Sequence, residues 1–182
     1  MRGSGIGAMC IALATALALL VPGPVALAAD APTGQGTAVP DASDRKQIEL
    51  ALAQGKFKAG DRRGAMVSLY QGKWYMPKRE KVRRCIAKRE SGANYRAVSA
   101  GGRYRGAYQM SRRLAVGASW MMQREVRREL GAEAKKLVIA LRKKPTQQWN
   151  RYWQDRAFWT IWHKGKGKSH WRGGGKNCMK RR

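Results

Sequence analysis

The cysteines of this chain constrain its fold more than any other feature. There are three of them, at positions 10, 85 and 178. Cys10 lies in an apolar leader that is predicted to be cleaved, which leaves Cys85 and Cys178 as an even pair in an oxidising compartment. Such a pair predicts one disulfide that closes a long loop, worth ~4 kcal/mol of loop-closure entropy. Two free thiols are the alternative, whereas no C-x-x-C spacing indicates a zinc site.

Residues 1–28 are predicted to be a signal peptide. Arg2 gives a positively charged start, residues 6–21 are almost entirely apolar, and Ala26-Leu27-Ala28 fits the small-x-small pattern of a cleavage site. A membrane anchor is the alternative, but prolines break the apolar run, which is short for a bilayer span of ~20 residues. No second apolar stretch follows, so we expect a secreted or cell-wall-associated protein without stable membrane insertion.

The charge balance indicates the class of partner. The chain has 38 Lys and Arg against 11 Asp and Glu, a formal net charge of +27 that becomes +26 without Arg2. A field of this size concentrates polyanions at the surface, although part of the charge can be ordinary solvated surface. For an exported protein, anionic cell-wall polymers are nearer than nucleic acid, for which we expect only non-specific binding.

Composition divides the rest of the chain into three segments. Residues 29–42 are rich in Ala, Pro, Gly and Thr and predict a disordered linker. Residues 43–76 form a predicted helical N-terminal extension, with Ser43 or Asp44 as its cap. This extension either packs on the following domain or is an independent adaptor. Residues 77–182 are enough for one core and end in a basic tail.

The apolar spacing within 77–182 predicts a small, mainly α domain. Pro77 suits a first helical position, and the helix that it begins is expected to end near Glu90. Glycines between 97 and 108 predict a loop or short hairpin. Further helices are expected at 111–116, 120–130, 132–143 and from Thr146 to about 163. One disulfide completes this domain, which we expect to be monomeric.

Few carboxyl groups follow Pro77, so each can be considered as a candidate catalytic acid. Three glutamates spaced four apart among Arg and Lys predict helix-surface partners, and Glu80 in a first turn complements the helix dipole. Glu90 instead stands at a helix C-terminus, where the dipole disfavours a carboxylate, and the turn Ser91-Gly92 favours a side chain that projects into a cleft. A surface glutamate paired with Lys88 or Arg89 is the alternative. The full set is Glu80, Glu90, Glu125, Glu129, Glu133 and Asp155.

Motifs around Glu90 carry a resemblance to a known family. The first is Cys85-Ile86-Ala87-Lys88-Arg89-Glu90-Ser91-Gly92-Ala93-Asn94-Tyr95, and the second is Tyr104-Arg105-Gly106-Ala107-Tyr108-Gln109-Met110. A distal stretch at 152–158 and an ending from Trp171 to Cys178 accompany them. Over roughly residues 78–178 they resemble the transglycosylase-like, resuscitation-promoting-factor-like branch of the lysozyme superfamily. The chain departs from that pattern because Cys85 lies five residues before Glu90 instead of beside it, and because the stretch 120–144 is longer and more basic.

The resemblance implies a lysozyme-like α+β fold with a groove for a chain of N-acetylglucosamine and N-acetylmuramic acid. Glu90 matches the family's catalytic acid and Gln109 the glutamine that lines the groove, while Tyr108 stands where the family has a residue near the sugar. Most aromatic residues of the last helix are expected to be core, with one or two facing substrate. The expected substrate-binding residues are Ser91, Tyr108, Gln109, Tyr152 and Trp153.

The expected reaction is cleavage of the β-1,4 bond between N-acetylmuramic acid and N-acetylglucosamine in peptidoglycan. A carboxylic acid can protonate the leaving oxygen if an apolar cleft keeps it protonated. An ordinary glycosidase uses two flanking carboxyls, and the one candidate for the second, Asp155, lies beside Arg156, where a salt bridge is expected. A single glutamate favours the lytic transglycosylase route, in which the 6-hydroxyl of muramic acid closes on the anomeric carbon. The alternatives are a hydrolytic muramidase, a non-catalytic cationic binding module, and a membrane-active or structural wall protein.

Nothing in the sequence indicates a cofactor. The two histidines, His163 and His170, lie in the basic tail without the spacing of metal ligands or of a catalytic triad. The Gly-Lys repeat at 165–168 lacks the P-loop pattern and predicts a flexible basic loop that contacts polyanions. We therefore expect an enzyme that needs no metal or cofactor.

Overall fold

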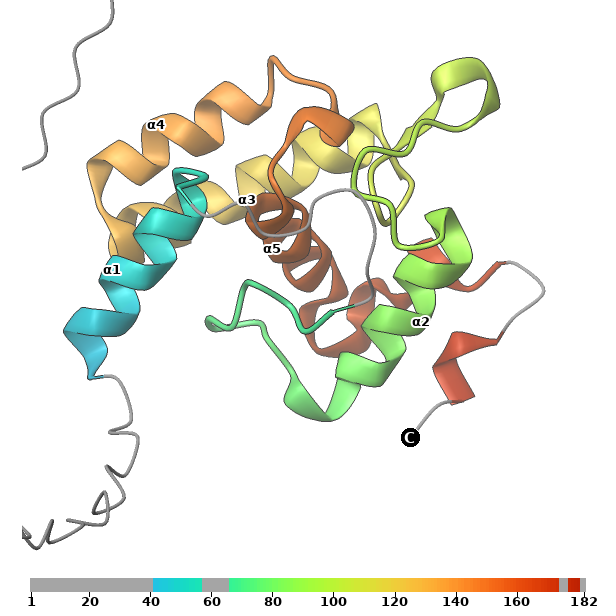
Figure 1. Ribbon diagram of the computed structural model, residues 1–182, viewed down its shortest axis with the longest axis horizontal. Helices are drawn as coiled ribbons and strands as arrows, with labels where there is room; N and C mark the ends of the chain where they lie inside the picture. Colours follow the sequence, from blue (N-terminus) through green and yellow to red (C-terminus); the bar gives the residue numbers. More distant parts are fainter. Residues whose placement is uncertain (1–40, 57–65, 174–176, 181–182) are drawn as a thin grey trace, which may run out of the picture. The chain divides into compact units, whose positions relative to one another are not determined.

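The computed structural model describes residues 41–56, 66–173 and 177–180, and residues 39–182 belong to one compact unit. The predicted signal peptide and nearly all of the predicted linker lie outside the described residues. The described part is mainly helical, with one two-stranded sheet (Figure 1). The α-helices are α1 (Ala42–Ala53), α2 (Glu80–Ser91), α3 (Arg112–Leu130), α4 (Ala132–Leu141) and α5 (Arg151–Trp162). Short 3₁₀ helices are η1 (Pro77–Arg79), η2 (Ala100–Gly102), η3 (Thr146–Gln148), η4 (His163–Trp171) and η5 (Cys178–Lys180).

The prediction of a mainly α domain with a short hairpin and one disulfide is confirmed. Strand β1 (Tyr104–Arg105) pairs antiparallel with β2 (Met110–Ser111). The disulfide joins Cys85 in α2 to Cys178 in η5 across a Cα–Cα distance of 5.6 Å. Among the described residues, no helix has both the length and the apolar character that a membrane span requires.

Side-chain caps set where three of the helices begin. The Asp41 carboxylate accepts the backbone N–H of Asp44 at 2.8 Å, so α1 starts at Ala42, inside the predicted linker. Ser111 caps α3 by accepting the N–H of Leu114. Asn150 caps α5, whereas Thr146, the predicted cap, begins the separate turn η3. In each case the side-chain oxygen satisfies a backbone donor that the first helical turn leaves unpaired.

The prediction of two helices between residues 111 and 130 is wrong, because α3 is continuous. Ser119 does not cap a second helix; its hydroxyl donates to the carbonyl of Val116 within α3. Gly117 lies inside the helix without breaking it, since tertiary packing outweighs its low helix propensity. The inward face of α3 contributes Ala115, Met122 and other residues to the core.

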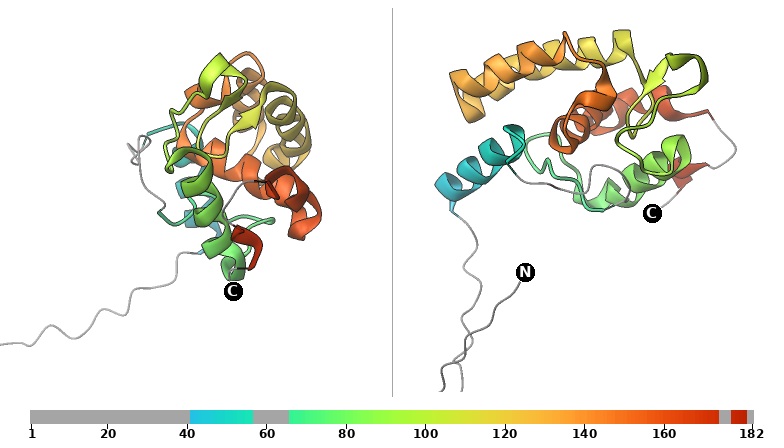
Figure 2. Two further views of the ribbon diagram at one scale, coloured as in Figure 1. Left: turned by 90° about the vertical axis from the view of Figure 1, so that its right-hand side faces the viewer. Right: turned by 45° about the horizontal axis from the view of Figure 1, so that its top comes forward.

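Helix α5 lies at the centre of the core. Every residue from Arg151 to Trp162 is buried, and α3 packs against this helix. Helix α4 packs along α3, and the two run antiparallel side by side (Figures 1 and 2). A helix that is buried all round must place its polar side chains in the interior, and this property of α5 shapes the rest of the structure.

The extension before residue 77 is part of the same core, which resolves the alternatives that the sequence left open. The side-chain amide of Asn150 donates to the carbonyls of Leu52 and Ala53 at the end of α1. Trp153 donates its indole N–H to the same Ala53 carbonyl at 2.9 Å. Further along, the backbone N–H of Leu69 donates to Asp155 at 2.9 Å. These bonds to α5 make residues 42–53 and 66–76 structural components of the domain.

Candidate active site

Glu90 lies in the last turn of α2, as the sequence predicts. Gly92 ends the helix in the left-handed conformation at φ 65° and ψ 25°, and its N–H bonds back to the carbonyls of Ala87 and Lys88. Glycine adopts this conformation without the steric cost of a Cβ, so the Ser-Gly sequence stops the helix directly after the glutamate. The Glu90 side chain is 25% exposed, which places it at the edge of the interior.

Glu90 lines an open pocket of about 520 Å³, which we call the Glu90 pocket. Its walls come from the end of α2, from the β1–β2 hairpin and from the C-terminal end of η4 and the residues after it. The pocket residues are Arg89, Glu90, Tyr104, Gln109, His170, Trp171 and Gly173. The tertiary structure therefore brings together three segments that are far apart in the sequence, and two of them carry predicted site residues.

Arg89 fixes the carboxyl group of Glu90. Its Nε and one terminal nitrogen donate to Oε1 of Glu90 at 3.0 and 2.6 Å, and that terminal nitrogen also donates to the carbonyl of Trp171 at 2.7 Å. Pairing with Arg89 was one of the alternatives for Glu90, and it occurs together with the pocket. Within the described residues, both of these bonds from Arg89 to the Glu90 carboxyl group go to Oε1.

Gln109 reaches the same pocket from the hairpin. Its backbone has a positive φ of 46°, and its amide nitrogen donates to the Gly106 carbonyl at 2.9 Å. Gly106 itself has a φ of +77°, and a Cβ there would lie 2.3 Å from Oε1 of Gln154. The tight turn therefore requires glycine at 106, and this turn presents Gln109 beside the α2 terminus. The amide oxygen of Gln109 has no partner among the described residues.

Ser91 has a supporting position instead of a position in the pocket wall. Its hydroxyl donates to the Ala107 carbonyl at 2.9 Å and accepts the N–H of Asn94 at 3.1 Å. These bonds join the end of α2 to the hairpin loop. We therefore infer that Ser91 fixes the position of the α2 end relative to the hairpin loop. Direct contact with substrate was expected for this residue, but it does not line the Glu90 pocket.

Three other predicted substrate-binding residues are core residues, which corrects the expectation. Tyr108, Tyr152 and Trp153 are 0%, 1% and 2% exposed, so none of them can touch a ligand in the Glu90 pocket as it stands. Tyr108 stacks on Phe158 with 4.6 Å between ring centroids, and Trp153 packs edge-on against Tyr152. The aromatic residues that do line the pocket are Tyr104, which is 44% exposed, the exposed His170, and Trp171, which is 3% exposed.

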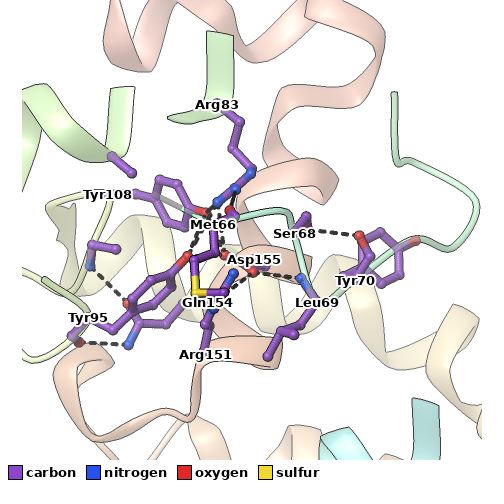
Figure 3. Close-up of polar contacts among 12 residues, drawn as sticks. Met66, Ser68, Leu69, Tyr70, Arg83, Tyr95, Tyr108, Arg151, Gln154 and Asp155 are labelled. Carbon is purple, nitrogen blue, oxygen red and sulfur yellow. Dashed lines mark hydrogen bonds and ion pairs between the residues drawn. The ribbon is translucent and has the colours of Figure 1, made fainter. Parts of the chain in front are cut away.

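The sequence did not reveal a buried polar cluster around Asp155, which we call the Asp155 cluster (Figure 3). Oδ1 of Asp155 accepts the hydroxyls of Tyr95 and Tyr108 at 2.6 and 2.5 Å and lies 3.3 Å from Arg83. Oδ2 lies 3.6 Å from Nε of Arg151. Burial, opposed by the neighbouring Arg83 guanidinium, raises the pKa of the Tyr108 phenol well above its ordinary value. All these side chains are buried, and Asp155 does not line the Glu90 pocket.

The predicted ion partners are also reassigned. Asp155 pairs with Arg83 and Arg151, whereas its sequence neighbour Arg156 binds Glu125 at 2.8 Å and Glu129 at 2.7 Å. Glu125 and Glu129 are therefore inward-facing partners of α5 and not surface residues of a solvated helix. The five buried polar or charged residues of α5 were a signal in the sequence, because polar groups on a fully buried helix need buried partners.

Within the described residues, no cluster of three or more His, Cys, Asp or Glu side chains is arranged to hold a metal ion. Comparison with protein-family models, with curated proteins and with solved structures finds no match to this chain. The function must therefore be argued from the geometry of the pocket and the chemistry of its residues.

Proposed function

We propose that this protein cleaves the glycan strands of peptidoglycan, with Glu90 as the catalytic acid. The observation that carries the proposal is that Glu90 and Gln109, on separate elements, line one pocket of about 520 Å³. A pocket of this size falls in the range of small-molecule sites and accommodates a sugar unit. It offers a carboxyl, an amide and aromatic surface, which are the groups that protonate, hydrogen-bond and pack against a sugar.

The single carboxyl in the pocket favours the lytic transglycosylase route over hydrolysis. Among the described lining residues, Glu90 is the one acidic side chain, and the other candidate, Asp155, is fully buried. A retaining or inverting glycosidase ordinarily needs two carboxyls beside the scissile bond, whereas a substrate-assisted reaction needs fewer. The 6-hydroxyl of the muramic acid then serves as the nucleophile, and the product ends in a 1,6-anhydro sugar.

The proposed steps use both oxygens of Glu90. Oε2 holds the proton that is given to the glycosidic oxygen as the bond to the anomeric carbon breaks. The resulting carboxylate then accepts the proton of the 6-hydroxyl as its oxygen bonds to that carbon. Throughout, Arg89 holds Oε1 and fixes the carboxyl orientation. The surplus of Lys and Arg attracts the protein to anionic polymers of the cell wall.

The test is mass spectrometry of purified peptidoglycan after incubation with the wild-type protein and with Glu90→Gln. Because general acid catalysis contributes ~10²–10⁴-fold, we expect Glu90→Gln to release at least ~100-fold less soluble anhydro-muropeptide. Glu133→Gln is the matched control, since it makes the same change on a 74% exposed glutamate paired with Lys136. Reducing ends in place of anhydro ends would assign a muramidase. Equal release by wild-type and Glu90→Gln proteins, or no release by either with intact binding, would overturn the proposal in favour of a cationic binding module.

A further inference from the structure

The outward face of the α3–α4 pair carries an unusual concentration of exposed apolar side chains. Trp120 and Met121 are 59% and 54% exposed on α3, and Ile139 is 39% exposed on α4. On α3 the same exposed stripe includes Arg113, two turns before Trp120, and arginines one and two turns after it. We call this face the α3–α4 surface, and its residues are Arg113, Trp120, Met121, Arg124, Arg127, Arg128, Ile139, Arg142 and Lys143.

The charge of this surface is strongly positive. Between positions 112 and 144 there are ten Lys and Arg and three Glu. Two of the three, Glu125 and Glu129, face inward and pair with Arg156, and the third, Glu133, pairs with Lys136. Each of these glutamates is thus paired with a cation, and Arg113, Arg124, Arg127 and Arg128 are exposed to solvent.

Trp120 is held at the surface instead of folding into the core. The guanidinium of Arg142 lies 3.4 Å from the centroid of the indole ring, a close cation–π contact. Arg142 is itself anchored, because it donates to the hydroxyl of Ser119 at 3.0 Å and also bonds to Gln123. One face of the indole is therefore covered by a fixed cation while more than half of the side chain stays exposed.

We propose that the α3–α4 surface docks on an anionic phospholipid bilayer. Tryptophan is favoured at the boundary between headgroups and acyl chains, and neighbouring apolar residues add buried area there. Arginines around such a group are attracted to the negative surface of the membrane. A nucleic acid could use the arginines and the indole, but it gives Met121 and Ile139 no apolar partner, so the lipid surface fits the whole set better. The docking is peripheral and is independent of cleavage at the Glu90 pocket.

The intrinsic fluorescence of Trp120 provides a direct test. Trp120 is the one exposed tryptophan among the described residues, since the other six are buried or half-buried. We expect vesicles of phosphatidylcholine with phosphatidylglycerol to shift the emission to shorter wavelength, and brominated acyl chains to quench it. Vesicles of phosphatidylcholine alone should cause neither change. Trp120→Phe should lose both signals, although the protein still sediments with anionic vesicles.

Paired variants separate the apolar and the electrostatic contributions. Trp120→Ala with Met121→Ala should lower partitioning onto anionic vesicles about tenfold, because apolar area is lost at the interface. Val98→Ser, which changes another exposed apolar residue, should leave it unchanged. Arg124→Gln with Arg128→Gln should weaken partitioning more than Lys81→Gln with Lys88→Gln, which removes the same charge from α2. Circular dichroism and thermal melting should show that every variant is folded.

Two outcomes would overturn the inference. The first is binding to DNA or another polyanion with no fluorescence shift on anionic vesicles, which would make the surface a polyanion site. The second is vesicle binding that the α3–α4 variants leave unchanged, which would place the contact elsewhere. Neither outcome depends on peptidoglycan cleavage, so failure here is distinguishable from failure of the Glu90 proposal.

Discussion

Arg83 and Asp155 show how single residues organise this domain. The Arg83 side chain is fully buried and contacts the carboxylates of Glu80 and Asp155 at 2.5 and 3.3 Å. It also donates to the carbonyl of Met66, which ties in the segment before α2. A buried charge is costly unless paired charges and hydrogen bonds satisfy it. The Asp155 cluster meets that condition and in doing so joins α2, α5 and residues 66–69.

Asp155→Asn tests the energetic role of this cluster. The amide keeps the shape of the side chain but removes its negative charge. The buried guanidinium groups of Arg83 and Arg151 then lose one of the carboxylates that neutralise them. We expect the free energy of unfolding to fall by ~3–5 kcal/mol, measured by urea denaturation. Glu133→Gln, on an exposed pair, should change it by less than ~0.5 kcal/mol. A loss of less than about 1 kcal/mol for Asp155→Asn would show that the cluster is replaceable.

At the scale of elements, helix α3 contains two serines with different roles. Ser111 caps the start of the helix, whereas Ser119 lies inside it and starts no new helix. Ser111 and Ser119 look alike in the sequence, as each precedes an apolar periodic run. Ser111 is the last residue of strand β2 and has extended backbone, with φ −66° and ψ 159°, and its hydroxyl accepts the N–H of Leu114. Ser119 lies within the helix and bonds back to a carbonyl of the preceding turn. The two serines therefore differ in the conformation of the backbone that precedes them, which is extended before Ser111 and helical before Ser119.

Ser111→Ala should lower the free energy of unfolding by ~1 kcal/mol, because the N–H of Leu114 loses its side-chain acceptor. The same variant should also loosen the hairpin that presents Gln109, since Ser111 is the last residue of β2. Ser43→Ala, an exposed change in the first turn of α1, is the control and should have an effect below ~0.5 kcal/mol. Hydrogen exchange at the start of α3 provides the local measurement, and unchanged protection there would contradict the capping role.

At the scale of the whole molecule, stability depends on keeping several phenols neutral inside a strongly basic protein. Burial is the largest cause that raises the pKa of Tyr70, Tyr95, Tyr108 and Tyr152 above the ordinary value of 10.0. Unfolding exposes these phenols to water, where they ionise at the ordinary pKa. The net charge of +27 acts in the other direction, because deprotonation of lysines at high pH relieves repulsion in the folded state.

The free energy of unfolding should therefore fall as the pH rises above about 10. Each phenol with a raised folded-state pKa contributes its stabilisation fully below the unfolded-state pKa and loses ~1.4 kcal/mol per pH unit above it. Urea denaturation between pH 8 and 11.5 in 0.5 M NaCl, which screens the lysine repulsion, measures this slope. Tyr108→Phe should have a shallower slope. A free energy that is flat across pH 10–11.5 would contradict the prediction.

Local and covalent features of this protein could be predicted from its sequence. The Ser91-Gly92 turn and the Ser111 cap act through neighbours along the chain, so the end of α2 and the start of α3 could be predicted, whereas the predicted caps of α1 and α5 were wrong. The Cys85–Cys178 disulfide followed from the number of cysteines. The position of Glu90 at a helix terminus followed from the same local rules.

Which side chains meet depends on packing between segments that are distant in the sequence. Helical spacing shows that aromatic residues share a face, but it does not show which element covers that face, so Tyr152 and Trp153 were assigned to substrate when they contact α1. Likewise, Asp155 has an arginine beside it in the sequence, yet its partner Arg83 comes from α2. The pocket around Glu90 forms where the end of η4 meets the end of α2, and no local sequence pattern shows that these two segments come together.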